Sequence, residues 1–273
     1  MAQQIRMRSR KTKSAFRLPI QAVSYRTFFV WRRDFDTFLR LWKTMSWPMF
    51  VEPVLFIVAM GFGLGRFVTD IDGLSFLQFI APGFIATSIM FTTSYECTFG
   101  SFVRMEFQRT FDAIIATPVN IEEVIAGDML WGATRGLFAA VGVTTVISAF
   151  GLVQSPWAIL IPIVAVLQGL MFASIAMVTT ALVPAIDAFT YYFTLGITPM
   201  FLFSGVFFPI DRLPETVQWL AWIFPLTHAV NLHRGLALGN VSWGLLGDFI
   251  WIVVAILIAF NVALALMRRR LIK

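Results

Sequence analysis

The stretch FIWIVVAILIAFNVALALMRRR, residues 249–270, decides how this chain folds. No charged side chain occurs from Phe249 to Met267, and an α-helix of that length spans about 28 Å, close to the ~30 Å hydrocarbon layer of a bilayer. Three arginines follow at once, and cations beside a membrane helix favour its cytoplasmic end. The sequence therefore predicts a crossing over 246–267 and a cytoplasmic carboxyl terminus.

Five more apolar runs precede this one. The chain is 58% hydrophobic and only 13% charged, which leaves too little polar surface for a water-soluble protein of this size. We predict an all-α polytopic membrane protein with six transmembrane helices. They are expected at 46–66, 79–103, 126–150, 157–183, 188–210 and 246–267.

The basic residues orient the predicted spans. Seventeen of the 21 Lys and Arg lie at the chain ends or in the loop after the second span, and only Arg66, Arg212 and Arg234 fall on the other side. Both termini are therefore predicted in the cytoplasm of a bacterial cell, with the chain in the inner membrane. The net charge of +6 alone is compatible with nucleic-acid binding, but charge gathered beside spans fits lipid headgroups, so no nucleic-acid partner is expected.

Three segments are not predicted to be spans, and two of them are rich in apolar residues. Residues 217–238 are broken by Pro225, and a seventh crossing would place the terminal arginines outside, so 212–240 is expected to form outer re-entrant helices. Residues 20–43 form an amphipathic helix in the inner headgroup region, or alternatively one packed on a partner protein. Residues 1–19 are a basic tail before the domain 20–273, with no features of a removable signal peptide. The aromatic stripe of the amphipathic helix comprises Phe28, Trp31, Phe35, Phe38 and Trp42.

The cytoplasmic loop 104–125 mixes charged and apolar residues. Its spacing indicates a short amphipathic helix ended by Thr117-Pro118, after which Asn120 and Glu123 resemble an N-cap for the third span. Such a helix is suited to transmit force from an attached motor, and a solvated connection is the alternative. Its candidate residues are Glu106, Phe107, Arg109, Phe111 and Asp112.

Three charged residues lie well away from the ends of the predicted spans. Glu52, Glu96 and Arg135 fall about 8, 10 and 14 Å from the cytoplasmic ends of their helices, where a charge requires a partner. We predict that Arg135 pairs with Glu96, with Glu52 as a possible third member. The network either braces the first three spans or lines a polar entrance for substrate.

Several kinds of site are missing from the sequence. There is no G-x-x-x-x-G-K-[ST] motif for nucleotide phosphates, so ATP-Mg is expected on another subunit and no cofactor in this chain. His228 and His233 have no further His or Cys nearby to complete a zinc site and are interpreted as interfacial. Cys97 is the only cysteine, and Gly132 with Gly136 forms a GxxxG pair. A membrane-bound enzyme is therefore disfavoured.

Two motifs resemble a known family. The sequence FSGVFFP at 203–209, followed by Leu213-Pro214, resembles the signature of type-2 ABC transporter permeases after their fifth span. The sequence FDA at 111–113, then ATPV at 116–119 and the residues to Arg135, is similar to the nodulation-factor exporter branch. The likeness covers about 20–267. The signature residues are Phe203, Ser204, Gly205, Phe208 and Pro209.

The resemblance implies a homodimer joined to two cytoplasmic ABC ATPase subunits. It implies export of a lipo-oligosaccharide, polysaccharide or other amphiphile, with 105–117 as the coupling helix and the amphipathic helix as an interfacial gate. A drug or antibiotic efflux permease is the alternative within the same family. An ion-coupled secondary transporter is a third reading, which predicts an internal repeat and charges at the midplane. The sequence shows no convincing repeat, and its charges lie off-centre.

Overall fold

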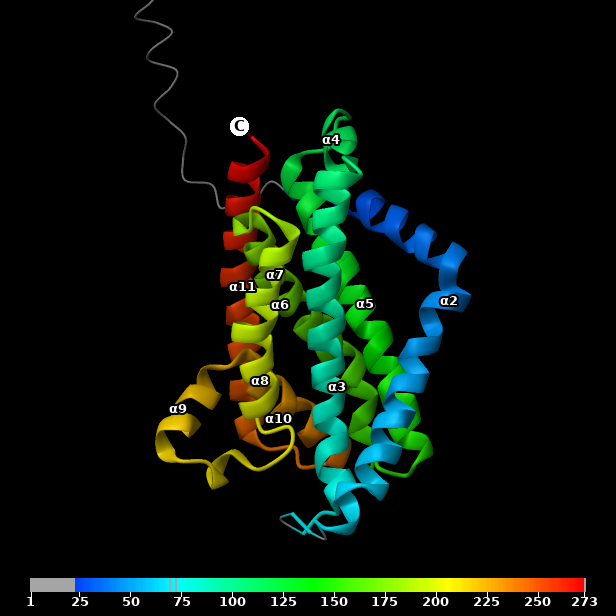
Figure 1. Cartoon of the computed structure of the whole chain (residues 1–273), viewed down its shortest axis with the longest axis vertical. Helices are drawn as coiled ribbons and strands as arrows, with labels where there is room; N and C mark the ends of the chain where they lie inside the picture. Colours follow the sequence, from blue (N-terminus) through cyan, green and yellow to red (C-terminus); the bar gives the residue numbers. More distant parts are fainter. Residues whose placement is uncertain (1–22, 69, 72, 273) are drawn as a thin grey trace, which may run out of the picture.

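The computed structural model describes residues 23–68, 70–71 and 73–272, and the predicted tail 1–19 lies outside them. In these residues the chain is helical, with one isolated bridge between Ile71 and Leu74 (Figure 1). The main helices are α2 (Thr27–Phe62), α3 (Phe76–Tyr95), α4 (Thr110–Ile115), α5 (Ile121–Ala149), α6 (Ile161–Leu182), α7 (Phe189–Tyr191), α8 (Thr198–Phe203), α9 (Glu215–Ile223), α10 (Pro225–Leu238) and α11 (Trp243–Leu271).

Four continuous helical stretches are long and apolar enough to cross a membrane, and α2 adds a fifth if its two arms count as one span. The four are Phe76–Phe107, Ile121–Ala149, Pro156–Leu182 and Trp243–Leu271. The expected crossing at 188–210 corresponds to an uninterrupted run of helical turns from Ile186 to Phe203, with a π turn at Tyr192–Ile197, and it is not among these four. The prediction of an all-helical membrane protein is confirmed, whereas the count of six crossings stays a prediction.

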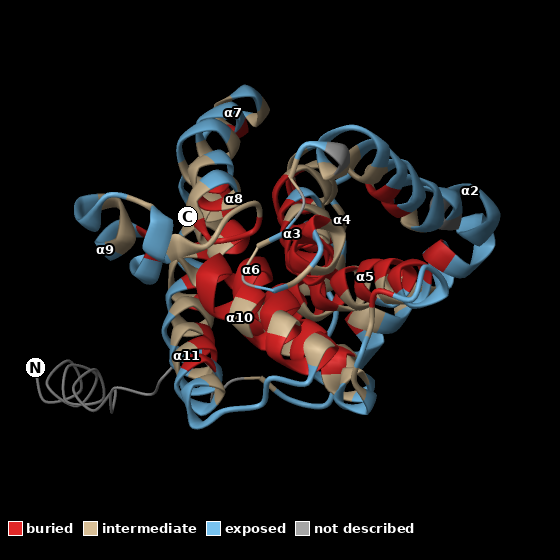
Figure 2. Ribbon diagram, turned by 90° about the horizontal axis from the view of Figure 1, so that it is seen from below, coloured by how far each residue is buried: buried red, intermediate tan, exposed pale blue. Residues whose placement is uncertain are grey.

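The predicted amphipathic helix and the first predicted span form one bent helix, α2. Its arms, Thr27–Thr44 and Trp47–Phe62, meet at 56°. The first arm packs on α5: Trp31 Nε1 donates a hydrogen bond to Thr134 Oγ1 over 2.9 Å, and the ring of Phe38 stacks on Phe138 with centroids 5.1 Å apart. The aromatic stripe is thus turned partly toward the protein, although Phe28 remains half exposed. Figure 2 shows α2 at the rim of the bundle with much of its surface exposed.

The centre of the bundle is formed by α3, α5 and α6, which carry most of the buried positions (Figure 2). Small residues let these helices approach closely. A methyl group at Gly169 of α6 would lie 2.9 Å from the Cα of Ala133 on α5. Gly132 and Gly136 face Cys97 and Thr93 of the α3 stretch, so the GxxxG pair is used for packing inside this chain.

The segment predicted as re-entrant contains two short helices, α9 and α10. They have 9 and 14 residues, and the chain turns between them at Phe224, which has an extended backbone (ψ 127°) before Pro225. Neither helix is long enough to cross a bilayer. In Figure 1 they lie at the opposite end of the bundle from α4 and the carboxyl terminus, and α10 is mostly buried whereas α9 lies at the edge.

The close approach of α5 and α6 generates a test. Gly169→Ala is expected to destabilise the protein by about 1–3 kcal/mol, because backbone atoms of Ala133 cannot yield as a side chain can. The matched control is Gly247→Ala on α11, where nothing lies within 4 Å of the added methyl group and alanine is the better helix former. Thermal unfolding in detergent should show a lower midpoint for the first variant only; equal midpoints would contradict the packing argument.

Candidate functional site

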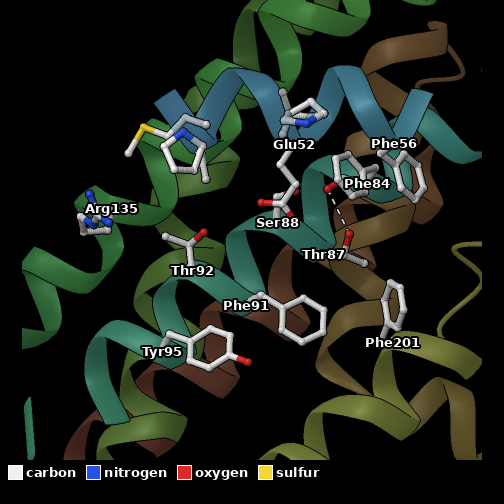
Figure 3. A pocket seen from close by; sticks show the side chains of 15 residues that line it. Glu52, Phe56, Phe84, Thr87, Ser88, Phe91, Thr92, Tyr95, Arg135 and Phe201 are labelled. Carbon is white, nitrogen blue, oxygen red and sulfur yellow. Dashed lines mark hydrogen bonds between the residues drawn. The ribbon is translucent and has the colours of Figure 1, made fainter. Parts of the chain in front are cut away.

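A cavity of about 630 Å³ lies between α2, α3, α5 and α8, and it brings together two of the charges singled out by sequence. Glu52 enters from α2 and Arg135 from α5, and Thr92 and Tyr95 of α3 also line the cavity (Figure 3). Aromatic rings form much of the remaining wall, including Phe201 of α8. The cavity therefore joins hydroxyl, charged and aromatic groups, a combination suited to an amphiphilic ligand.

The predicted pair of Glu96 and Arg135 is brought together, but Arg135 is not the main partner. Arg104 Nη1 donates to Glu96 Oε1 over 2.7 Å, and Trp131 Nε1 donates to the same oxygen over 3.1 Å. Arg135 Nε lies 3.6 Å from the other oxygen, Glu96 Oε2, which is an ion pair without a hydrogen bond. The strongest interactions of the Glu96 carboxylate are therefore with Arg104 and Trp131.

Arg104 belongs to this cluster, although the sequence did not predict it there. The sequence placed it in a cytoplasmic loop, whereas the α3 stretch continues through two π turns, Glu96–Gly100 and Val103–Phe107. Its side chain is only 14% exposed, and Arg104 Nε lies 2.9 Å from Asp128 Oδ1. Asp128, fully buried on α5 and also bonded by the Ser101 hydroxyl, was missed altogether.

Asp128 lies near the start of the predicted third span, where an acidic residue is easily taken as interfacial. The signal that was available is the opposite charge at Arg104, close to the end of the preceding span. Glu52 lines the same cavity as Arg135, but within the described residues it makes no ion pair within 4.0 Å. The network thus consists of Glu96, Arg104, Arg135 and Asp128, without Glu52.

The predicted coupling helix 105–117 is two pieces instead of one. The first ends at Phe107 and the second is α4, and between them Arg109 adopts a left-handed conformation (φ 53°, ψ 28°) that breaks the helix. Phe111 is fully buried, whereas Phe107 is 67% exposed. Arg109 and Asp112 pair on the surface, Nη1 to Oδ2, at 3.3 Å.

The remaining candidate of this segment, Glu106, accepts a hydrogen bond of 2.9 Å from Arg270 Nη2 near the end of α11. Arg270 also donates to the carbonyl oxygens of Thr180 and Val183, at the end of α6. One arginine therefore ties the carboxyl-terminal end of α11 to the coupling segment and to the loop after α6.

The predicted signature forms the turn that ends α8. Ser204 is buried, and Gly205 has a φ of 74°, a conformation that favours glycine. Arg234 of α10 donates to the carbonyl oxygens of Gly205, over 2.8 Å, and of Phe79 on α3, over 3.2 Å. The later signature residues Phe208 and Pro209 are half-buried and lead into the short helix Ile210–Arg212. The signature thus anchors α8 to α10 and α3.

The two histidines are engaged in hydrogen bonds with the protein. His228 Nδ1 lies 2.6 Å from Asp248 Oδ1 of α11, and His233 Nε2 lies 2.8 Å from Gln168 Oε1 of α6. His233 is fully buried, so its interfacial interpretation was wrong. Across the residues that the structure describes, no cluster of three or more His, Cys, Asp or Glu could hold a metal ion.

Comparison with known proteins agrees with this architecture. The chain is 36% identical over 247 residues to nodulation protein J of Rhizobium leguminosarum bv. trifolii, covering 89% of this chain and 93% of that protein. It is 36% identical over 248 residues to nodulation protein J of Rhizobium meliloti, covering 89% and 92%. The inner membrane transport permease YadH of Escherichia coli K12 is 27% identical over 240 residues, covering 88% and 93%.

The profile of the ABC-2 type transporter family matches residues 25–238, from just before α2 to the end of α10. This range includes the cavity between α2, α3, α5 and α8, the coupling segment and the signature turn. The chain therefore belongs to the ABC-2 type transporter family.

Proposed function

We propose that this chain is the permease subunit of an ATP-driven exporter and that its own residues hydrolyse no ATP. The observation that carries the proposal is the segment Val103–Ile115, which projects at one end of the bundle with Phe107 exposed and Phe111 anchored inside (Figure 1). An exposed aromatic beside surface charges suits a protein contact. Such a segment connects an ATPase to the helices around the cavity.

The same end of the bundle indicates how the chain is oriented in the membrane. The start of α2, the α4 segment and the carboxyl terminus lie together, and we propose that this end is cytoplasmic (Figure 1). Arg268, Arg269 and Arg270 in the last turn of α11 support this orientation. The pieces from Ile186 to Phe203 are then the remaining crossing, which completes six, and α9 and α10 lie in the outer leaflet.

The cargo that the site favours is an amphiphile such as a lipo-oligosaccharide. Hydroxyl groups of Thr92 and Tyr95 and the charges of Glu52 and Arg135 offer hydrogen bonds to a polar head, while aromatic rings offer apolar contact. Two relatives are named as nodulation proteins, which supports this class. The working assembly is a homodimer with two ATPase subunits, as family membership suggests.

The proposal is tested by transport in vesicles. Purified chain reconstituted with its ATPase subunit is expected to move a labelled lipo-oligosaccharide only with ATP and Mg²⁺, and vanadate should stop the movement. Vesicles holding the chain alone, or the chain with an ATPase lacking its catalytic acid, serve as controls. Transport by the chain alone would contradict the proposal.

Phe107 and Phe111 provide a matched pair for the coupling segment. Phe107→Ala should reduce copurification of the ATPase and ATP-driven transport severalfold while leaving thermal stability unchanged, because the ring contacts solvent. Phe111→Ala should instead lower stability by about 3–5 kcal/mol, because the ring is buried. Since the ATPase is cytoplasmic, the same result places α4 in the cytoplasm. Undiminished ATPase association with Phe107→Ala would contradict the assigned contact.

The distances in the ion network predict that its two arginines have unequal coupling energies with Glu96. In double-mutant cycles on unfolding, Arg104→Ala with Glu96→Ala should show an interaction of about 1–3 kcal/mol, whereas Arg135→Ala with Glu96→Ala should show clearly less. The reason is geometric: the first pair shares a 2.7 Å hydrogen bond, and the second is an ion pair at 3.6 Å. Equal coupling energies would show that Arg135 is as important a brace as Arg104.

A further inference from the structure

Arg135 keeps most of its hydrogen-bonding capacity unused. A guanidinium has five N–H donors, yet Nε and Nη1 of Arg135 are buried and make no hydrogen bond. Its charge has two neighbours, the Glu96 carboxylate at 3.6 Å and the face of the Phe38 ring, whose centroid lies 5.3 Å from Cζ. Buried donors without acceptors are costly, so this side chain suits a ligand with an acidic oxygen.

The Glu96 carboxylate does not satisfy the unused N–H donors of Arg135. Its Oε1 atom already accepts hydrogen bonds from Arg104 and Trp131, and Arg104 supplies a full positive charge at 2.7 Å. Arg104 also pairs with the buried carboxylate of Asp128, so Arg135 supplies the second positive charge for these two acids. It does so at 3.6 Å without forming a hydrogen bond, and it also lines the cavity (Figure 3).

Glu52 gives the cavity a second, opposite charge. It lines the same space from α2, and among the described residues no hydrogen bond or ion pair engages its carboxylate. A purely anionic ligand would be repelled by it. The two side chains together match a head group that carries an acidic oxygen and, near it, an N–H or O–H donor.

The space continues beside Glu52 into an apolar groove of about 560 Å³. Cavity and groove share Pro48, Glu52, Phe56 and Phe84. The groove extends over Trp47, Val51 and Leu55, which are exposed on the second arm of α2. An apolar groove that opens on the exposed side of a predicted span and adjoins a charged cavity fits an acyl chain attached to a polar head.

We propose that the cavity and this groove form one binding site for an acyl amphiphile whose head carries a phosphate or sulfate next to a hydrogen-bond donor. Arg135 binds the acidic group, Glu52 accepts from the donor, and the chain lies along Trp47 and Leu55. The proposal rests on the proposed function in one respect: this ligand belongs to the class of amphiphiles proposed above as the export substrate. A bilayer phospholipid and an acylated export substrate share this chemistry.

The test measures binding of lysophospholipids with brominated acyl chains to the full chain in maltoside micelles. Bromine quenches tryptophan on contact, and the difference between wild type and Trp47→Phe isolates the signal of the groove. Trp219→Phe is the matched control, since Trp219 is equally exposed but lies on α9. Lysophosphatidylethanolamine and lysophosphatidylcholine share the phosphate, the free glycerol hydroxyl and a positive nitrogen, and only the first has N–H donors.

We expect saturable quenching of Trp47, with lysophosphatidylethanolamine binding about tenfold more tightly than lysophosphatidylcholine. Arg135→Gln should weaken both ligands about tenfold, and Glu52→Gln should remove the preference for lysophosphatidylethanolamine, because its N–H donors then lose the carboxylate acceptor, while weakening lysophosphatidylcholine less. Arg269→Gln, in the last turn of α11, is the charge control. Glu52 is exposed, so Glu52→Gln is expected to fold. This variant therefore still tests the site if Arg135→Gln fails to fold.

Equal binding of the two lipids, or quenching unaltered by both variants, would overturn the site. The assay contains no ATPase, so its failure would leave the vesicle test of ATP-driven export untouched. Adding the ATPase with ATP and Mg²⁺ separates the two sources of ligand. If the site holds an export substrate, ATP hydrolysis should release the brominated lipid and lower the quenching. If it holds a resident membrane lipid, the quenching should stay the same. Either result supports the site.

Discussion

The ion pair between Arg104 and Asp128 is the interaction on which the half of the bundle that contains α4 and the carboxyl terminus depends. A fully buried carboxylate on α5 is tolerable only with a nearby cation, and Arg104 provides one at 2.9 Å. The same guanidinium binds Glu96, so a single side chain holds α3 against α5 and contacts two acids. It carries one positive charge, and Arg135, 3.6 Å from Glu96, supplies the second while lining the cavity.

The position of Arg104 is a consequence of local helix geometry. Two π turns between Glu96 and Phe107 change the angle at which side chains leave the helix. Arg104 and Glu96 are eight residues apart, and they meet at 2.7 Å. A π turn is uncommon and often marks a functional site, and here it lies at the junction between a membrane helix and the coupling segment.

The sequence was sufficient for those features that depend on composition or length. Apolar runs predicted the helices, the break before Pro225 separated α9 from α10, and the charges at 96 and 135 led to a pair that is close in space. It was not sufficient for features that depend on how helices meet. Hydropathy ended the predicted second span at 103, but the buried carboxylate of Asp128 on α5 keeps Arg104 within the helix bundle. In the same way, the polar side chain of His233 can be buried because Gln168 on α6 provides a hydrogen-bond partner.

The triple engagement of Arg270 has a mechanical consequence. By donating to Glu106 and to the carbonyls at the end of α6, it connects the end of α11, the segment Val103–Ile115 and the end of α6. If an ATPase contacts Val103–Ile115, as proposed above, a displacement of that segment would be transmitted through Arg270 to α6 and α11. Loss of this one side chain would remove the connection while leaving the residues of the cavity in place.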